Sequence, residues 1–235
     1  MRHRPDALML FAAGFGKRML PLTADRPKPL IRVAGTALID HALAVADGVP
    51  LARKVVNLHY LPDQIRHHLR HRPDLTLLTE SPDILETGGG LRHALPQLGP
   101  GPVFVLNSDA VWRGPNPLQM LAECWNPDLM DVLLLLAPAS QAQGHTGPGD
   151  FALDDQGRIS RAPGVARTHV YLGAHITRTD SLAAVPGVVF SLNLIWNQMI
   201  AAGRAFGVNY PGQWCDVGRP DSIALAEAML QAGHV

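Results

Sequence analysis

The sequence has little cysteine, no net charge and no apolar run long enough to cross a bilayer. Its two cysteines, Cys124 and Cys215, are far apart and form no C-x-x-C pair, which fits buried free thiols in a reducing compartment. The formal net charge is +0, so no overall field attracts nucleic acid or an anionic membrane. We therefore expect a cytoplasmic protein that binds small charged ligands through local clusters of charge.

The N-terminus resembles a short signal peptide, because residues 1–4 are basic and residues 7–13 are apolar. This apolar run passes directly into a loop of glycine, lysine and arginine, so we do not expect secretion. With 235 residues, of which 47% are hydrophobic, the chain is long enough for one sizeable core and short for two. We expect a single globular domain.

The first 136 residues alternate between short apolar runs and helical patterns. Strands are expected at 7–12, 54–58, 75–79 and 103–106, and helices at 36–47, 61–71 and 90–98. This alternation predicts an α/β, Rossmann-like domain with a mainly parallel, doubly wound sheet. Ligands of such sheets bind outside the carboxyl ends of the strands.

After residue 137 the pattern changes to shorter strands. A polar loop at 139–150 precedes an expected hairpin at 151–153 and 158–160. Further strands are expected at 170–176, 205–209 and 214–217, and helices at 192–202 and from Pro220 to near Gly233. The second part therefore predicts a small antiparallel subregion.

The loop at 10–29, called the opening loop below, reads L-F-A-A-G-F-G-K-R-M-L-P-L-T-A-D-R-P-K-P. Gly14 and Gly16 let the backbone approach an anion closely, and Lys17, Arg18 and Lys28 supply positive charge. We interpret the loop as a polyphosphate site, although a merely basic turn would show the same glycines.

Two other phosphate-binding motifs fit this loop poorly. A Walker A loop needs Ser or Thr after Gly-Lys, and Arg18 stands there. A dinucleotide fingerprint needs a third Gly or Ala, and the matching residue is Met19.

A second glycine-rich stretch, L-E-T-G-G-G at 85–90, lies between an expected strand and an expected helix. Three consecutive glycines cost much conformational entropy. They indicate either a flexible turn or a nucleoside lying against bare backbone.

Two aspartates stand at the ends of expected strands, Asp109 in N-S-D and Asp216 in W-C-D-V-G. Either one alone could cap a turn. If both project from the carboxyl edge of one sheet, they form the sparse oxygen site that Mg²⁺ prefers when phosphates and water complete its shell. Asp150 and Asp221 remain alternatives.

Taken together, several motifs resemble the sugar-1-phosphate nucleotidyltransferases. They are A-A-G-F-G-K-R-M-L-P-L-T-x-x-x-P-K-P-L-I, L-E-T-G-G-G, N-S-D, G-D-F at 149–151 and W-C-D-V-G-R-P. The resemblance covers nearly the whole chain, and within the family the chain looks most like the N-acetylmuramate 1-phosphate uridylyltransferase branch. It implies a GT-A-like fold, Mg²⁺ as cofactor, an NTP and a sugar 1-phosphate as substrates, and a place in peptidoglycan recycling.

The resemblance also implies roles for individual residues. The backbone of Ala12, Ala13, Gly14 and Gly16, with Lys17, Arg18 and Lys28, would bind the phosphates. Gly88 and Gly89 would face the base and ribose, with Glu80 a further candidate. Asp109 and Asp216 would bind the metal, and Asp150, Tyr171 and Gly173 would hold the sugar. Asn107 would contact the nucleotide or the other substrate. Residues 1–136 would then form the nucleotide part, and 137–235 the sugar-phosphate part.

Two departures from the family pattern are visible. Ser108 stands where glycine is usual, and all three lysines lie in the first quarter of the chain. Many relatives place a lysine from the second half on the sugar phosphate, so Arg158, Arg161, Arg167 or a histidine would have to replace it.

Three alternative functions stay open. They are mannose-1-phosphate guanylyltransferase, a nucleotide-binding regulatory protein without turnover, and a nicotinamide-dependent oxidoreductase, against which Met19 argues.

Overall fold

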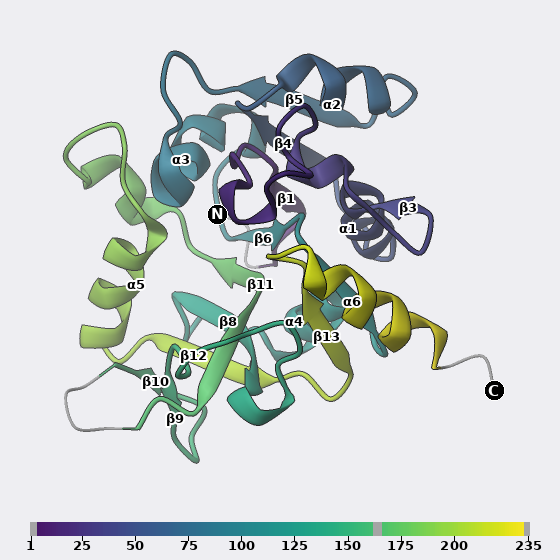
Figure 1. Cartoon of the computed structure of the whole chain (residues 1–235). Helices are drawn as coiled ribbons and strands as arrows, with labels where there is room; N and C mark the ends of the chain where they lie inside the picture. The colour runs from purple at the N-terminus through teal and green to yellow at the C-terminus, as the bar shows by residue number, and fades with distance from the viewer. Residues whose placement is uncertain (1–3, 162–165, 233–235) are drawn as a thin grey trace.

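The computed structural model describes residues 4–161 and 166–232, and a seven-stranded sheet forms its centre (Figure 1). The strand order is β12-β8-β11-β6-β1-β4-β5. Their bounds are β1 Ala7–Phe11, β4 Arg53–Leu58, β5 Leu75–Thr79, β6 Val103–Asn107, β8 Val132–Pro138, β11 His169–Thr177 and β12 Ala205–Asn209. All neighbours pair in parallel except β11, which is antiparallel to β6 and β8. The predicted mainly parallel sheet is confirmed.

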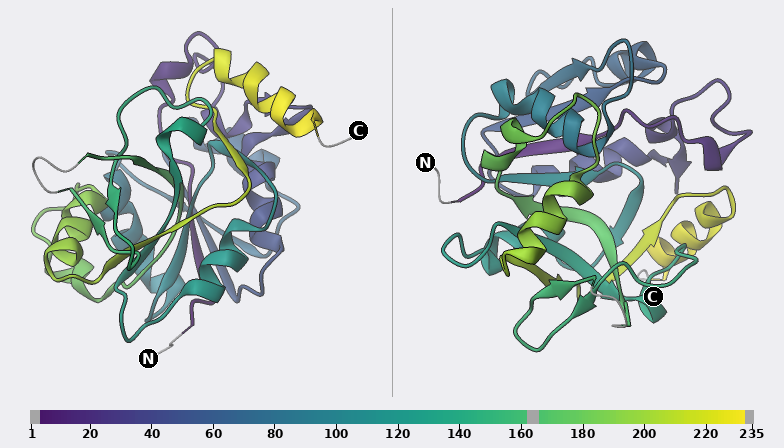
Figure 2. Two further views of the ribbon diagram at one scale, coloured as in Figure 1. Left: turned by 90° about the horizontal axis from the view of Figure 1, so that it is seen from below. Right: turned by 90° about the vertical axis from the view of Figure 1, so that its left-hand side faces the viewer.

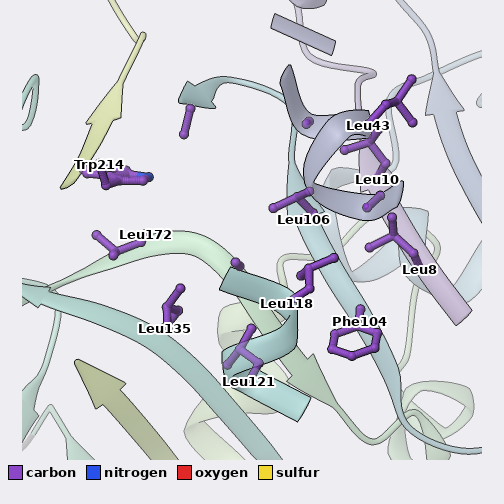
Figure 3. Close-up of a cluster of buried hydrophobic side chains, with 14 of the residues drawn as sticks. Leu8, Leu10, Leu43, Phe104, Leu106, Leu118, Leu121, Leu135, Leu172 and Trp214 are labelled. Atoms are coloured by element: carbon purple, nitrogen blue, oxygen red, sulfur yellow. The ribbon is translucent and has the colours of Figure 1, made fainter. Parts of the chain in front are cut away.

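Both faces of the sheet are buried. Successive strand residues point to opposite sides of the sheet, and both sets of side chains belong to core clusters. In β1, Leu8 and Leu10 join one core cluster, and Ala7 and Met9 join the other. The first cluster includes residues of α1 (Leu38–Asp47) and α4 (Pro117–Cys124), and Figure 3 shows part of it. The second includes residues of α3 (Glu86–Leu98) and α5 (Leu192–Ala201). Figure 2 shows these helices around the sheet.

The remaining elements surround this centre. They are α2 Pro62–His68, α6 Asp221–Gln231, β2 Arg32–Val33, β3 Thr36–Ala37, β7 Ala110–Arg113, β9 Ala152–Leu153, β10 Ile159–Ser160, β13 Gln213–Asp216 and the 3-10 turns Lys17–Met19, Lys28–Leu30, Ala139–Gln141 and Asp180–Ala184. The expected hairpin is β9–β10. No helix of the described residues is long and apolar enough to cross a membrane.

The elements β7, α4 and β8 were not predicted, and three predicted features differ in the structure. The strands β11 and β12 do not form a separate subregion but lie in the central sheet, where β11 is inserted between β6 and β8. The helix expected at 36–47 begins at Leu38, because the two preceding residues pair with β2. The end predicted for the last helix, Gly233, lies outside the described residues.

The third difference is that α3 begins at Glu86 and includes the three glycines. The N–H groups of Gly88 and Gly89 both donate to the Phe190 carbonyl, at 2.8 and 3.0 Å. A Cβ on Gly88 would lie 2.4 Å from the Phe190 ring, and one on Gly89 2.3 Å from the Val188 carbonyl oxygen. These glycines therefore allow α3 to approach the segment that leads into α5.

Candidate active site

A cavity of about 240 Å³ opens at the carboxyl ends of β1 and β6. The residues that line it are Phe11, Ala12, Ala13, Gly14, Lys28, Pro29, Asn57, Glu80, Ile84, Glu86, Thr87, Asn107, Ser108 and Asp109. The predicted site residues that border this one space are Ala12, Ala13, Gly14, Lys28, Glu80, Asn107 and Asp109. The predicted residues that are not among the lining residues are Gly16, Lys17, Arg18, Gly88, Gly89, Asp150, Tyr171, Gly173 and Asp216, although Glu86 and Thr87, next to Gly88 and Gly89, are.

The loop after β1 turns sharply at Gly16, which has φ +62°. Its carbonyl accepts hydrogen bonds from Met19 N at 2.8 Å and from Thr23 Oγ1 at 2.9 Å. A Cβ at Gly16 would lie 2.9 Å from Cβ of Lys28 and 3.1 Å from Cγ2 of Thr23. The turn at Gly16 thus packs against the stem of Lys28, one of the cavity residues.

Replacing Gly16 by alanine is expected to destabilise the protein by about 2 kcal/mol, because the left-handed backbone is costly for alanine and the new methyl group crowds Lys28. Chemical denaturation measures the change. Gly14→Ala is the matched control, since a Cβ at Gly14 meets nothing within 4 Å. Equal stability of the two variants would contradict this reading of the turn.

Lys28 and Asp109 form the central ion pair of the site. Lys28 is 8% exposed, and its Nζ donates to Oδ2 of Asp109 at 2.8 Å. A charged group this buried needs a partner, and the carboxylate provides one. Lys28 begins the 3-10 turn Lys28–Leu30 at the end of the loop at 10–29, and Asp109 follows β6, so the pair joins two segments of the cavity wall.

Asp216 lies beside Asp109, although it does not belong to the central sheet. β13 pairs antiparallel with β7, which places Asp216 opposite Ala110, and Val217 N donates to the Asp109 carbonyl at 2.9 Å. The two aspartates therefore do not project from the carboxyl edge of one sheet. The β7–β13 pair brings them together instead.

The charges around Asp216 agree with this proximity. Burial and the nearby Asp109 carboxylate raise the pKa of Asp216, whereas Lys28, Arg18 and His145 act in the opposite direction. The structure thus gathers two carboxylates and two permanent cations from four segments. The Nζ of Lys17 lies over the ring of Phe15, 5.4 Å from the ring centre.

The donor set fits Mg²⁺, which is usually held by one or two carboxylates together with substrate phosphates and water. In 4–161 and 166–232, no group of three or more His, Cys, Asp and Glu side chains forms a complete protein cage. Two carboxylates beside the loop after β1 match an ion that arrives with its substrate. The alternative ligand Asp150 is engaged elsewhere, since its Oδ2 accepts from Tyr171 N at 2.9 Å.

Tyr171 and Gly173, two of the residues predicted for the sugar side, lie near Asp109 and Asn107, respectively. Burial, together with the charges of Asp109 and Asp150, raises the pKa of Tyr171 well above its usual value. Gly173 has φ +83°, and a Cβ there would lie 3.1 Å from the Asn107 side chain. Glycine thus lets β11 pass close to Asn107.

The cations considered as replacements for a second-half lysine are spread out. Arg158 lies over Phe206, at 5.7 Å from the ring centre, and β12 is three strands from β6. Arg161 lies 4.2 Å from the centre of the Phe151 ring and is close enough to Asp150 to sense its charge. His145 is close enough to Asp216 to lower the pKa of its carboxyl.

A buried histidine supports Tyr171 from behind. His175 is 1% exposed, its Nδ1 lies 2.6 Å from the Tyr171 hydroxyl, and its Nε2 has no hydrogen-bond partner in the described structure. Burial lowers its pKa from 6.5 to about 3. His175 is therefore neutral in the folded protein at all but strongly acidic pH.

The pKa shift predicts a loss of stability in mild acid. The unfolded chain takes up a proton on His175 below about pH 6.5, whereas the folded chain does so only near pH 3, so stability falls across this window as pH decreases. Between pH 7.5 and 5, wild type is expected to lose about 2 kcal/mol more unfolding free energy than His175→Gln. Equal losses, measured by urea denaturation, would contradict the buried neutral histidine.

Sequence reasoning missed Asn57, whose side chain accepts from Ala12 N at 2.8 Å and donates to Glu80 at 2.7 Å. Its position near the carboxyl end of β4 was a usable signal. The Ala12 amide is thus already paired within the protein. Ser108, in place of the usual glycine, donates to the Phe11 carbonyl at 2.6 Å and holds two cavity segments together.

The MobA-like NTP transferase domain model matches residues 8–151, which is more than half of the chain and contains the opening loop, Lys28 and Asp109. The chain belongs to this nucleotidyltransferase family. An N-acetylmuramate alpha-1-phosphate uridylyltransferase of Caulobacter vibrioides is 41% identical over 98% of this chain and 99% of its own length. The protein of that name from Neisseria meningitidis is 28% identical over 95% and 98%.

A more distant relative and a solved structure are also similar to this chain. A probable mannose-1-phosphate guanylyltransferase of Arabidopsis thaliana is 24% identical over 90% of this chain and 61% of its own length. The crystal structure of HddC from Yersinia pseudotuberculosis with GMP-PN superposes with a TM-score of 0.77, at 16% identity over 96% of this chain and 99% of that one. This likeness confirms the nucleotidyltransferase fold.

Proposed function

We propose that the protein transfers a uridylyl group from UTP to N-acetylmuramate 1-phosphate, giving a UDP-sugar and pyrophosphate. The observation that carries a transfer reaction is the meeting of Asp109 and Asp216 with Lys28 and Arg18 beside the loop after β1. The choice of uracil and of the muramate sugar is supported by the Caulobacter relative, which matches nearly from end to end.

The chemistry needs no general base. The second pKa of a phosphate monoester is about 6, so the sugar phosphate is already an anion and its oxygen can attack the α-phosphorus of UTP. The bond to the β-phosphate oxygen then breaks, and pyrophosphate leaves with the negative charge. Catalysis consists of aligning two polyanions and stabilising the charge that moves onto the leaving group.

The residues divide these tasks. The backbone of Ala13, Gly14 and Gly16 binds the triphosphate, and Lys28 and Arg18 neutralise it. Asp109 and Asp216 would hold Mg²⁺, which neutralises phosphate charge and orients the phosphates when bound.

The sugar side uses residues from the second part of the chain. Asp150, Tyr171 and Gly173 position the sugar, and His145 or Arg161 stands in for the missing lysine at its phosphate. In this proposal residues 1–136 mainly bind the nucleotide and 137–235 the sugar phosphate. Both substrates are small, and the reaction belongs to peptidoglycan recycling in the cytoplasm.

A substrate panel tests the proposed function. Purified protein is incubated with Mg²⁺ and each pair of UTP, GTP, CTP or dTTP with muramate, glucosamine or mannose 1-phosphates, and pyrophosphate release is followed. We expect the highest kcat/KM with UTP and N-acetylmuramate 1-phosphate. Preference for GTP and mannose 1-phosphate would favour the guanylyltransferase alternative, and nucleotide binding without turnover would favour a regulatory protein.

A further inference from the structure

Glu80 is a buried carboxylate that faces no cation among its hydrogen-bond partners in the described structure. It is 2% exposed and follows β5, and Asn57 on the neighbouring strand β4 is 3% exposed. Both residues line the cavity. A carboxylate at this depth is costly unless donors satisfy it, so its partners indicate what it is for.

Those partners form a chain of three hydrogen bonds across the end of the sheet. Ala12 N donates to Oδ1 of Asn57 at 2.8 Å, and Nδ2 of Asn57 donates to Oε1 of Glu80 at 2.7 Å. The second oxygen, Oε2, accepts from Leu85 N at 2.7 Å. The three hydrogen bonds therefore connect the start of the opening loop to the start of α3.

Both ends of this hydrogen-bond connection lie at the cavity wall. Ala12, Ala13 and Gly14 from the loop after β1, and Ile84, Glu86 and Thr87 from the segment that leads into α3, are among the lining residues. Gly90 of α3 lies directly against the connection, since a Cβ there would be 2.6 Å from Oε1 of Glu80 and 3.2 Å from Nδ2 of Asn57. Helix α3 therefore packs directly against Asn57 and Glu80.

We propose that Asn57 and Glu80 are positioning residues, which hold the opening loop and the 81–87 segment at the separation that admits a nucleoside triphosphate. Glu80 then acts through the segment it holds and is not itself a contact to the base or ribose. The inference rests on the proposed function only for the identity of the ligand.

Because each hydrogen bond has a fixed direction, the proposal can be tested by swapping the amide and the carboxylate between positions 57 and 80. A glutamine at 80 always leaves one pair of donors facing each other, at Asn57 or at Leu85, or at Ala12 if Asn57 turns over. An aspartate at 57 faces the Glu80 carboxylate directly. The double variant Asn57→Asp/Glu80→Gln restores all three bonds with the donor and acceptor between 57 and 80 reversed, and it keeps the net charge.

Isothermal titration with UTP and Mg²⁺ measures the effect on binding. We expect Asn57→Asp and Glu80→Gln each to raise Kd about tenfold, because a segment that is in place a tenth of the time binds with a tenth of the affinity. The double variant is expected to return to within about twofold of wild type. Asn116→Asp is the matched control: Asn116 Nδ2 donates to the Val45 carbonyl at 2.8 Å, and Asn116 is not among the residues that line the cavity.

Amide hydrogen exchange at Ala12 and Leu85 tests the positioning without any ligand. Protection is expected to fall in both single variants and to recover in the double. Unchanged protection in the singles, or a double variant as weak as Glu80→Gln, would overturn the proposal; the latter would mean that the carboxylate contacts the nucleotide itself. Wild-type protein that binds no nucleoside triphosphate would count against the proposed function. The amide hydrogen exchange measurement would still test the positioning role of Asn57 and Glu80.

Discussion

Replacing Asp109 by asparagine is expected to lower kcat/KM for pyrophosphate release by at least about 100-fold, equivalent to roughly 3 kcal/mol. The asparagine keeps the shape of the side chain but removes the charge that pairs with Lys28 at 2.8 Å and faces Asp216. It also removes one of the two carboxylates that fit Mg²⁺. Initial rates at saturating and limiting UTP measure the loss.

The control for this variant is Asp40→Asn. Asp40 and Asp109 have similarly exposed side chains, 38% and 32%, and Asp40 pairs with His68 away from the cavity. We expect its activity to stay near wild type. Near-normal turnover by Asp109→Asn, with both variants folded, would rule out the metal site proposed at Asp109 and Asp216.

Lys28→Met is expected to produce the second large effect, a loss on the order of 100-fold in kcat/KM with weaker UTP binding. Methionine preserves the apolar stem that packs against Gly16 but removes the ammonium group. The lost charge would otherwise stabilise negative charge on the phosphates in a buried site, where such interactions are strong.

Lys54→Met is the matched control for Lys28→Met. The two lysine side chains are 14% and 11% exposed, and Lys54 pairs with Asp47 and Asp74 instead of a cavity residue. Both variants lose a lysine from an ion pair, yet only Lys28→Met should impair turnover. Equal activity of the two would show that Lys28 serves the fold and not the phosphates.

Much of the fold follows from local sequence pattern. The β1 strand, for example, was predicted within one residue, because its apolar run is short, continuous and followed by glycine. The position of β11 could not be predicted, since its hydrophobicity does not reveal that it inserts antiparallel between β6 and β8. Strand order depends on contacts between residues far apart in the chain.

The residues of the candidate site also include some that local sequence predicts and some that only the folded structure reveals. Gly16 and Lys28 are readable from the loop motif itself, and the structure explains the glycine by its φ of +62°. Residue Asn57 belongs to no motif, and its role appears only when β1, β4 and β5 lie side by side. Likewise, nothing in L-E-T-G-G-G shows that Phe190 will occupy the space beside the glycines.

The most direct test of the proposed reaction is a phosphorus NMR time course with UTP, N-acetylmuramate 1-phosphate and Mg²⁺. We predict that both substrates disappear together and that a UDP-sugar and pyrophosphate form in equal amounts, with no reaction when either substrate is omitted. Release of inorganic phosphate, or loss of UTP without the sugar phosphate, would contradict nucleotidyl transfer by this site.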